Sequence, residues 1–162
     1  MADTYITEEM RAQIGKERER KVSFPVDASA IRQWAIAVRW PDPPERIYWD
    51  EEYARKSRFG GIIAPPFFNP FAYHVDEDRM KGVVRQGTVS MEPGTRPLNG
   101  GGEAEYYEPM RPGDVITSVT KVVEMYERQG RLGLMLFTIT ETTWTNQKGE
   151  LVRVYRGTGI RY

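Results

Sequence analysis

Two stretches near the C-terminal end decide which fold we expect: "DVITSVTKVVEMYE" at residues 114–127 and "GLMLFTITETTWTN" at residues 133–146. Both are rich in valine, isoleucine, threonine and aromatic residues, which favour β-strands. Working outward, the pattern continues in "EAEYYEPM" at residues 103–110 and "ELVRVYRGTGIRY" at residues 150–162. The turn-forming sequences "RPGD", "RQGRLG" and "QKGE" separate the four stretches. The sequence therefore predicts four antiparallel strands from residue 103 to residue 162.

The N-terminal part predicts one further strand, followed by an amphipathic helix. "KVSFPVD" at residues 21–27 alternates, which places on one face of a strand Val22, Phe24 and Val26. The next segment, "ASAIRQWAIAVRW" at residues 28–40, predicts a helix that Asp27 or Ser29 would cap. The apolar residues at helical spacing in this segment are Ile31, Trp34, Ala35 and Val38. A shorter helix is predicted in "DEEYARKS" at residues 50–57.

The most apolar stretch, "GGIIAPPFFNPFAYH" at residues 60–74, contains Pro65, Pro66 and Pro70. It is the strongly apolar segment left to cover the sheet, so we expect residues 62–74 to form the dominant helix. Pro65 and Pro66 fit a first helical turn, where backbone N–H groups lack intrahelical partners. Pro70 would kink the helix. The expected class is α+β, with one antiparallel sheet packed on one helix.

Composition excludes several classes of site and partner. The 162 residues suit a single domain over residues 1–162, and the 23 basic and 23 acidic residues balance, which argues against nucleic acid and anionic membranes as partners. The chain has no cysteine and one histidine, which argues against a metal site. The N-terminal segment is charged and lacks an apolar run, so we expect no secretory signal, no membrane span and a cytoplasmic location.

The strings "RFGGIIAPPFF" (58–68), "GGGEAEYYEPMRPGDVI" (100–116) and "TNQKGELVRVYRGTGIR" (145–161), in this order of elements, resemble the hot-dog fold. Within that fold, roughly residues 5–162 resemble the MaoC-like dehydratases, specifically the N-terminal-half type also called the FAS1-like dehydratase domain. The resemblance implies a sheet wrapped around a central helix and the pairing of two hot-dog units. It also implies thioesters of coenzyme A or acyl carrier protein as substrates, with no other cofactor.

In catalytic members of this family, a loop of the form G-D-x-N-P-x-H supplies an aspartate and a histidine, which handle the water molecule and the proton. Alignment of "IYWDEEYA" at residues 47–54 with the family pattern x-H-x-D-x-x-Y-A places Tyr48 at the histidine position and Asp50 at the later aspartate. The loop aspartate of the family falls near Pro43. The neighbouring Asp42 is then either catalytic, through a shifted loop, or an ordinary loop residue.

The family also uses a backbone N–H at the start of the central helix to stabilise the thioester oxyanion. Pro65 and Pro66 occupy the corresponding positions here, and proline has no N–H. The substituted or displaced family positions, namely Asp42, Tyr48 and Pro66, therefore form no complete catalytic set.

The apolar segment and its surroundings supply the candidate ligand contacts. Each aromatic residue is by itself a core candidate, but one or two of the following should line an acyl channel: Phe67, Phe68, Phe71 and Tyr73. His74 falls two turns beyond the family's reaction site, so we expect it at a surface or interface. The basic cluster of Arg55, Lys56 and Arg58 either meets coenzyme A phosphates or forms a solvated face.

The sequence thus favours an acyl-thioester-binding, non-catalytic subunit of a heteromeric (R)-specific enoyl-CoA hydratase or 3-hydroxyacyl-thioester dehydratase, acting on long-chain or steroid-like acyl groups. The expected partner is a second hot-dog subunit bearing D-x-N-P-x-H, and the chain alone is expected to form a homodimer. Three alternatives remain open. A homodimeric hydratase would use Asp42 and Tyr48, and a thioesterase would need a carboxylate that residues 59–74 lack. The third is an acyl-CoA binding module with no enzymatic context.

Overall fold

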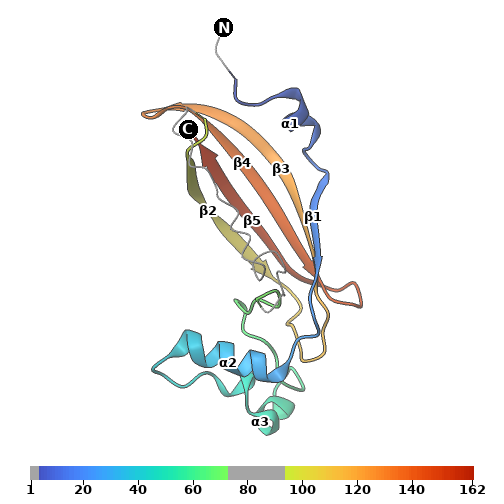
Figure 1. The fold of residues 1–162 in the computed structure, drawn as a ribbon. Helices are drawn as coiled ribbons and strands as arrows, with labels where there is room; N and C mark the ends of the chain where they lie inside the picture. Colours follow the sequence, from blue (N-terminus) through green and yellow to red (C-terminus); the bar gives the residue numbers. More distant parts are fainter. Residues whose placement is uncertain (1–3, 73–93) are drawn as a thin grey trace, which may run out of the picture.

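Five strands form one antiparallel sheet in the computed structural model, which describes residues 4–72 and 94–162 (Figure 1). The strand order is β1-β3-β4-β5-β2. The strands are β1 (Glu17–Val22), β2 (Pro97–Tyr106), β3 (Thr117–Gly130), β4 (Gly133–Thr145) and β5 (Leu151–Arg161). The four strands predicted for the C-terminal part are confirmed, although β2 begins at Pro97, earlier than expected. The predicted α+β class is confirmed as well.

Short connections hold the long strands β3, β4 and β5 in register. A hairpin joins β3 to β4, and the residues at its end, Gly130 and Gly133, face each other. Between β4 and β5, the side-chain Oδ1 of Asn146 accepts hydrogen bonds from the backbone N–H groups of Lys148 and Glu150, both at 3.0 Å. Such side-chain acceptors stabilise tight turns. The turn sequences recognised between the strands therefore do fold as turns.

The helices lie together at one end of the sheet, apart from α1 (Glu8–Ala12) (Figure 1). The longest described helix is α2 (Ala28–Arg39), and η1 (Arg46–Tyr48) and α3 (Glu51–Lys56) follow it. The Asp27 side chain accepts hydrogen bonds from the N–H groups of Ser29 and Ala30, which confirms the predicted cap. No helix within residues 4–72 and 94–162 is long and apolar enough to cross a membrane.

The prediction of a dominant helix over residues 62–74 is wrong for residues 62–72, which form turns and irregular backbone; residues 73 and 74 lie outside the described part. Pro65 and Pro66 therefore do not occupy a first helical turn, and Pro70 kinks no helix. Three prolines remove three donors, and the neighbouring N–H groups bond elsewhere. The Ala64 N–H donates to the Met110 carbonyl at 2.8 Å, and the Phe68 N–H donates to the Pro65 carbonyl at 2.9 Å.

The prediction that Val22, Phe24 and Val26 share a strand face is also wrong. The strand β1 ends at Val22, and the backbone of Ser23 bonds to Ile116 through its N–H at 2.8 Å. Val26 is buried, whereas Val22 and Phe24 are 55% and 62% exposed. In α2 the helical face is confirmed for Ile31, Trp34 and Ala35, which are buried or half-buried, but Val38 is exposed.

The core lies where the segment after α3 meets α2 and the nearest ends of the strands. Phe68, Ile31 and Ile116 are its largest fully buried side chains. Trp34 meets Phe68 edge-on, with 5.8 Å between ring centroids. The other buried members of this cluster are Val26, Ala64, Met110, Trp144 and Val152. The proline-rich segment thus reaches the core as a loop that carries Phe68 inward.

Candidate functional site

A cavity of about 400 Å³ lies between η1, the segment after α3, and the strands β2 and β5. Its wall is mainly apolar, with Ile63, Met110 and Val152 among the lining residues. The same wall includes three positions that the sequence analysis singled out, Tyr48, Pro65 and Pro66. A volume of this size and character suits a small-molecule ligand. We therefore treat this cavity as the candidate site and refer to it below as the thioester cavity, after the ligand class that the family resemblance implies.

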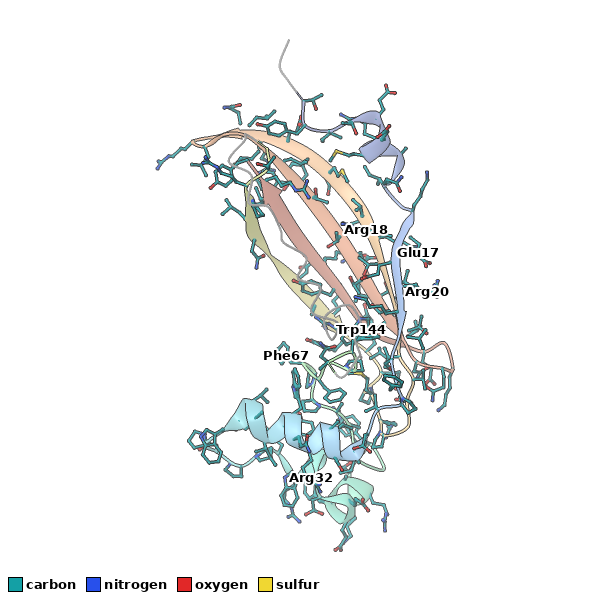
Figure 2. All side chains as sticks on the ribbon, viewed as in Figure 1. Glu17, Arg18, Arg20, Arg32, Phe67 and Trp144 are labelled. Atoms are coloured by element: carbon teal, nitrogen blue, oxygen red, sulfur yellow. The ribbon has the colours of Figure 1, made fainter. Side chains whose placement is uncertain are left out.

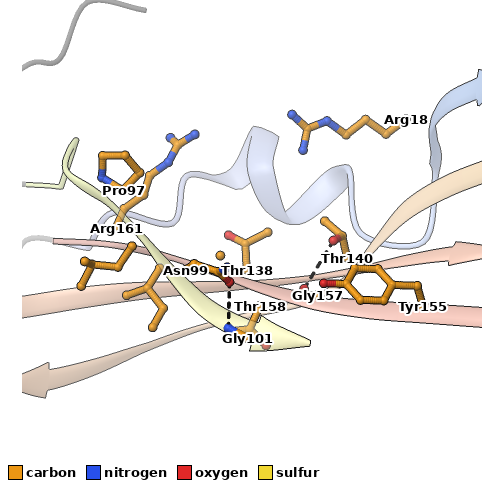
Figure 3. A pocket seen from close by; sticks show the side chains of 13 residues that line it. Arg18, Pro97, Asn99, Gly101, Thr138, Thr140, Tyr155, Gly157, Thr158 and Arg161 are labelled. Carbon is orange, nitrogen blue, oxygen red and sulfur yellow. Dashed lines mark hydrogen bonds between the residues drawn. The ribbon is translucent and has the colours of Figure 1, made fainter. Parts of the chain in front are cut away.

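A larger hollow of about 440 Å³ lies on the face of the sheet (Figure 3). Arg18 of β1 stands across from Tyr155 of β5 there, and threonines of β4 line the floor. The Thr140 hydroxyl donates a hydrogen bond to the Gly157 carbonyl at 3.3 Å, so this polar group of the floor already has a partner within the sheet. None of the predicted site residues lines this hollow, and the thioester cavity remains the better candidate despite its smaller volume.

Tyr48, the last residue of η1, is half-buried against the hydrophobic core. Burial raises the pKa of the Tyr48 phenol above its ordinary value, and the nearby Glu45 carboxylate adds to this effect while Arg39 opposes it. A phenol whose pKa lies above ~10 stays protonated at neutral pH. Tyr48 can therefore donate a hydrogen bond to a ligand, but it is a poor general base.

Asp42 and Asp50, the two carboxylates near the family's loop position, lie in different settings. Asp42 is exposed just after α2, its N–H donates to the Arg39 carbonyl at 2.8 Å, and it does not line the thioester cavity. Asp50 caps α3 by accepting from the Tyr53 N–H at 2.9 Å, and it pairs with Arg46 at 2.6 Å. These two donors lower the pKa of Asp50, the backbone N–H most strongly. The structure therefore gives Asp50 a helix-capping role.

Pro65 is buried and Pro66 is exposed, and both border the thioester cavity beside the turn that ends at Phe68. Neither residue has an N–H to offer a ligand. The preceding Ala64 N–H is already bonded to the Met110 carbonyl. The two proline positions thus contribute shape and apolar surface to the cavity, and no backbone donor.

The aromatic residues of the predicted acyl channel occupy three different environments. Phe68 is 1% exposed in the core, and Phe71 is half-buried with its ring edge-on to Trp144 at 5.5 Å. Phe67 is 72% exposed and meets Tyr106 edge-on at 5.9 Å. Phe67 and Trp144 both lie at the end of the sheet that faces α2 (Figure 2). None of these phenylalanines lines the thioester cavity, and Tyr73 and His74 fall outside the described residues.

The predicted basic cluster does not act as one unit. Lys56 forms an ion pair with Glu52 at 2.6 Å on the exposed face of α3, and Arg55 is exposed on the same helix. Arg58 differs, because it lines the thioester cavity and stacks on Phe59, with 4.6 Å between the guanidinium carbon and the ring centroid. Only Arg58 of this cluster therefore borders the candidate site.

A model of the family described as FAS1-like, dehydratase domain region matches residues 12–154. The chain belongs to the FAS1-like dehydratase domain family. Among curated proteins, the probable enoyl-CoA hydratase alpha subunit of Thermomonospora curvata is 29% identical over an alignment of 153 residues, gaps included, that covers 88% of this chain and 47% of that protein. The chain thus spans about half the length of this relative.

Solved structures share the fold of this FAS1-like dehydratase domain. The MaoC-like dehydratase from Rhodospirillum rubrum aligns with a TM-score of 0.59 and 23% identity, over 89% of this chain and 90% of the other. The ChsH1-ChsH2 complex from Mycobacterium tuberculosis gives a TM-score of 0.65 with 16% identity, over 94% of this chain and 87% of the other. The predicted hot-dog dehydratase fold and family are therefore confirmed.

Sequence reasoning missed several polar or charged residues of this FAS1-like dehydratase domain's cavity, namely Tyr106, Tyr107, Glu108 and Arg153, the last of which lies on β5. The guanidinium carbon of Arg153 lies 4.6 Å from the ring centroid of Trp144 and 5.1 Å from that of Tyr155. The only sequence signal was the alternation in "VRVYRGT", which puts Arg153 and Tyr155 on one face of the strand. The cavity thus combines three tyrosines, two guanidinium groups, the exposed carboxylate of Glu108 and an apolar wall. These groups can bind and orient a ligand, and the raised pKa of the Tyr48 phenol makes that residue a poor base.

Proposed function

We propose that this chain is the acyl-thioester-binding, non-catalytic subunit of a heteromeric (R)-specific enoyl-CoA hydratase or 3-hydroxyacyl-thioester dehydratase, acting in the cytoplasm. One observation carries the proposal. A single cavity is lined by Tyr48, which the resemblance aligns with the family's histidine, and by Pro65 and Pro66, which it aligns with the family's oxyanion donor. The phenol of Tyr48 has a raised pKa, and the prolines lack N–H groups.

The chemistry explains why these substitutions matter together. Hydration of a 2-enoyl thioester requires a base that deprotonates water at C3 while C2 of the enolate accepts a proton. It also requires donors at the thioester oxygen, and the loss of one such donor lowers the rate by ~10²–10³-fold. Since the positions that the resemblance aligns with the family's catalytic residues carry no base in this cavity, we infer that a partner hot-dog subunit bearing D-x-N-P-x-H supplies the catalytic pair.

The comparisons support a heteromeric setting. One relative is named as an alpha subunit, and one solved structure of the same fold is a complex of two proteins. The edge strand β2 is exposed along almost its whole length, and such an edge favours pairing with another sheet. We propose that this edge meets the catalytic partner and that, without the partner, two copies of this chain pair instead.

The acyl group that we propose is long-chain or steroid-like. The thioester cavity offers about 400 Å³ and a mainly apolar wall, a volume within the range of sites for drug-sized ligands. The predicted kinked helix does not contribute to this width, because residues 62–72 form no helix. The loop that contains Pro65 and Pro66 forms part of the cavity wall together with residues of β2 and β5.

The test is hydration of crotonyl-CoA and of a long-chain enoyl-CoA by the purified chain, alone and co-expressed with a D-x-N-P-x-H hot-dog subunit. We expect no turnover by the chain alone and turnover by the pair. A turnover number of ~1 s⁻¹ or more for the chain alone would overturn the proposal. If Tyr48→Phe then abolished that activity, the chain would be a hydratase that uses Tyr48 itself.

A further inference from the structure

The strand β2 leaves one edge of the sheet open. Within residues 4–72 and 94–162 it pairs on one side only, with β5, and it lies at the end of the strand order (Figure 1). The register between β2 and β5 shifts between Asn99 and Gly102 and is regular from Gly102 to Tyr106. A register shift disrupts the ladder locally. An added strand therefore meets a regular edge at residues 102–106, which we call the β2 edge segment.

Charged side chains form a row that crosses the sheet from this segment to β1. The strand register sets five residues opposite one another in turn: Glu103 of β2, Arg156 of β5, Glu141 of β4, Lys121 of β3 and Glu17 of β1. Their charges alternate in sign from each strand to the next. Opposite charges at facing positions stabilise a sheet, whereas like charges there destabilise it. The row therefore specifies which charge a further strand should carry.

Negative charge is in excess at the β2 end of the row. Arg156 lies 3.9 Å from Glu103 and 3.4 Å from Glu105, but it also pairs with Glu141 at 2.8 Å. One guanidinium thus serves three carboxylates, and the Tyr107 hydroxyl that donates to Glu105 at 2.8 Å adds no charge. The side chains of Glu103 and Glu105 are 74% and 54% exposed, so both are accessible to another strand.

The acidic residues of β1, at the opposite edge of the sheet, are compensated within their own strand. Glu17 pairs with Arg20 at 2.7 Å, and Glu19 pairs with Lys21 at 2.9 Å. Each carboxylate of this edge therefore has a cation of its own. The uncompensated charge of the row thus lies at β2, beside the open backbone edge.

A second copy of this chain matches the β2 edge segment poorly. Two copies that pair antiparallel along residues 102–106 meet about Ala104, the middle of that range. Glu103 of each copy then lies opposite Glu105 of the other, which makes two like-charge pairs that destabilise the joined sheet. A strand with lysine or arginine at these positions would continue the alternation of charge instead.

We propose that the β2 edge segment selects a partner strand that carries lysine or arginine opposite Glu103 and Glu105, in preference to a second copy of this chain. This inference rests on the proposed function, because it specifies the edge charge of the partner subunit that meets this edge. The backbone N–H and C=O groups of an open edge bind any extended strand, so they give affinity without selectivity. The side-chain charges add selectivity, since like charges across an interface penalise the wrong partner.

The experiment uses a charge-reversed copy of this chain as the partner with a basic edge. Equal amounts of isotope-labelled wild type and unlabelled Glu103→Lys/Glu105→Lys double variant are mixed at low ionic strength, and native mass spectrometry measures the share of mixed dimers. Random pairing gives about one half. We expect at least about four-fifths, because each mixed dimer replaces two like-charge pairs by two opposite-charge pairs.

The matched control for this mixture is the Glu17→Lys/Glu19→Lys double variant. It changes the net charge by the same amount but at the β1 edge, so its share of mixed dimers with the wild type should stay much closer to one half. Thermal melting checks that both variants are folded.

A neutral variant tests the same inference without charge reversal. Glu103→Gln/Glu105→Gln removes both like-charge pairs, so its dimer should dissociate at least about threefold less readily than that of the wild type in analytical ultracentrifugation at low salt. High salt should shrink this difference, because it screens exposed charges. Glu17→Gln/Glu19→Gln should dissociate as the wild type does.

Two results would overturn the inference and leave edge pairing intact. One is a share of mixed dimers no higher than that of the β1 control, and the other is a neutral variant that self-associates no more tightly than the wild type. If the wild type, the variants and their mixtures all remain monomers, the edge pairing in the proposed function fails together with the inference. The hydration assay with the co-expressed subunit tests the catalytic part of the proposed function separately, since the mixing experiment needs no substrate.

Discussion

Replacement of Phe68 by alanine is the sharpest test of how the proline-rich segment is built. Phe68 is 1% exposed and packs edge-on against Trp34 at 5.8 Å. A buried phenylalanine removes ~150–250 Å² from water, which at ~25 cal/mol per Å² corresponds to ~4–6 kcal/mol. Alanine keeps the Cβ, so we expect Phe68→Ala to lower the free energy of unfolding by ~3–5 kcal/mol, the usual range for such truncations.

The neighbouring residue provides the matched control. Phe67 is 72% exposed, so it contributes roughly a quarter of that buried area, together with its edge-on contact to Tyr106. We therefore expect Phe67→Ala to lower the free energy of unfolding by only ~1 kcal/mol. The two variants differ by one position in the chain and have the same change in composition. A difference in the loss of unfolding free energy between the two variants therefore shows which of the two rings the loop buries.

The assay is urea unfolding followed by far-ultraviolet circular dichroism. With a slope of ~1–3 kcal/mol per molar urea, the expected loss shifts the midpoint of Phe68→Ala by at least ~1 M. The reasoning is refuted if Phe68→Ala and Phe67→Ala shift the midpoint equally, or if Phe68→Ala loses less than ~1 kcal/mol. Either result would mean that Phe68 faces an open channel and that the core is closed by other residues.

Three further predictions concern catalysis, pH and assembly. Pro66→Gly restores a backbone N–H but not the histidine, so the isolated variant should show no hydration of crotonyl-CoA in a spectrophotometric assay; robust turnover would mean that Tyr48 or Asp42 already serves as the base. The pKa of Asp50 is lowered in the folded state, so the stabilisation by its carboxylate is present above the unfolded value of ~3.9 and is lost as pH falls through the folded value. The melting temperature of Asp50→Asn should therefore lie below that of the wild type at pH 5, and this gap should narrow at pH 3; a constant gap would contradict the charge assignment. Light scattering should give the isolated chain the mass of a dimer, with an interface above ~1,000 Å², whereas a mass near 18.7 kDa would argue against edge pairing.

The strands β3, β4 and β5 and the start of α2 could be predicted because local chemistry decides them. The β-branched and aromatic residues of β3, β4 and β5 favour extended backbone wherever they stand, and the intervening turn residues set where each strand ends. The Asp27 side chain caps α2 by accepting hydrogen bonds from N–H groups two and three residues later in the chain. The capping residue and its donors therefore lie in one short stretch of sequence, where a local pattern can reveal them. The family resemblance singled out Tyr48, Pro65 and Pro66 by matching short sequence motifs. The structure places all three residues in the wall of one cavity.

The path of residues 62–72 was not predictable from apolar content. The sequence suggested a helix because the stretch is hydrophobic, but burial can be achieved by any backbone that turns the right side chains inward. The Ala64 N–H finds the Met110 carbonyl, far along the chain, and the turn from Pro65 to Phe68 completes the loop. Tertiary hydrogen bonding thus replaces the helical bonds that the three prolines cannot make.

By itself, the sequence determined the class of fold and the boundaries of β3, β4 and β5 to within a few residues. Only the tertiary structure decided which side chains share the cavity. Tyr106, Trp144 and Arg153 become neighbours because the register of β2, β4 and β5 sets them side by side. That register depends on pairing among strands far apart in the chain. The three aromatic rings around the Arg153 guanidinium, and its lack of an ion pair within residues 4–72 and 94–162, are properties of this arrangement, since what surrounds a charge depends on the packing of distant segments.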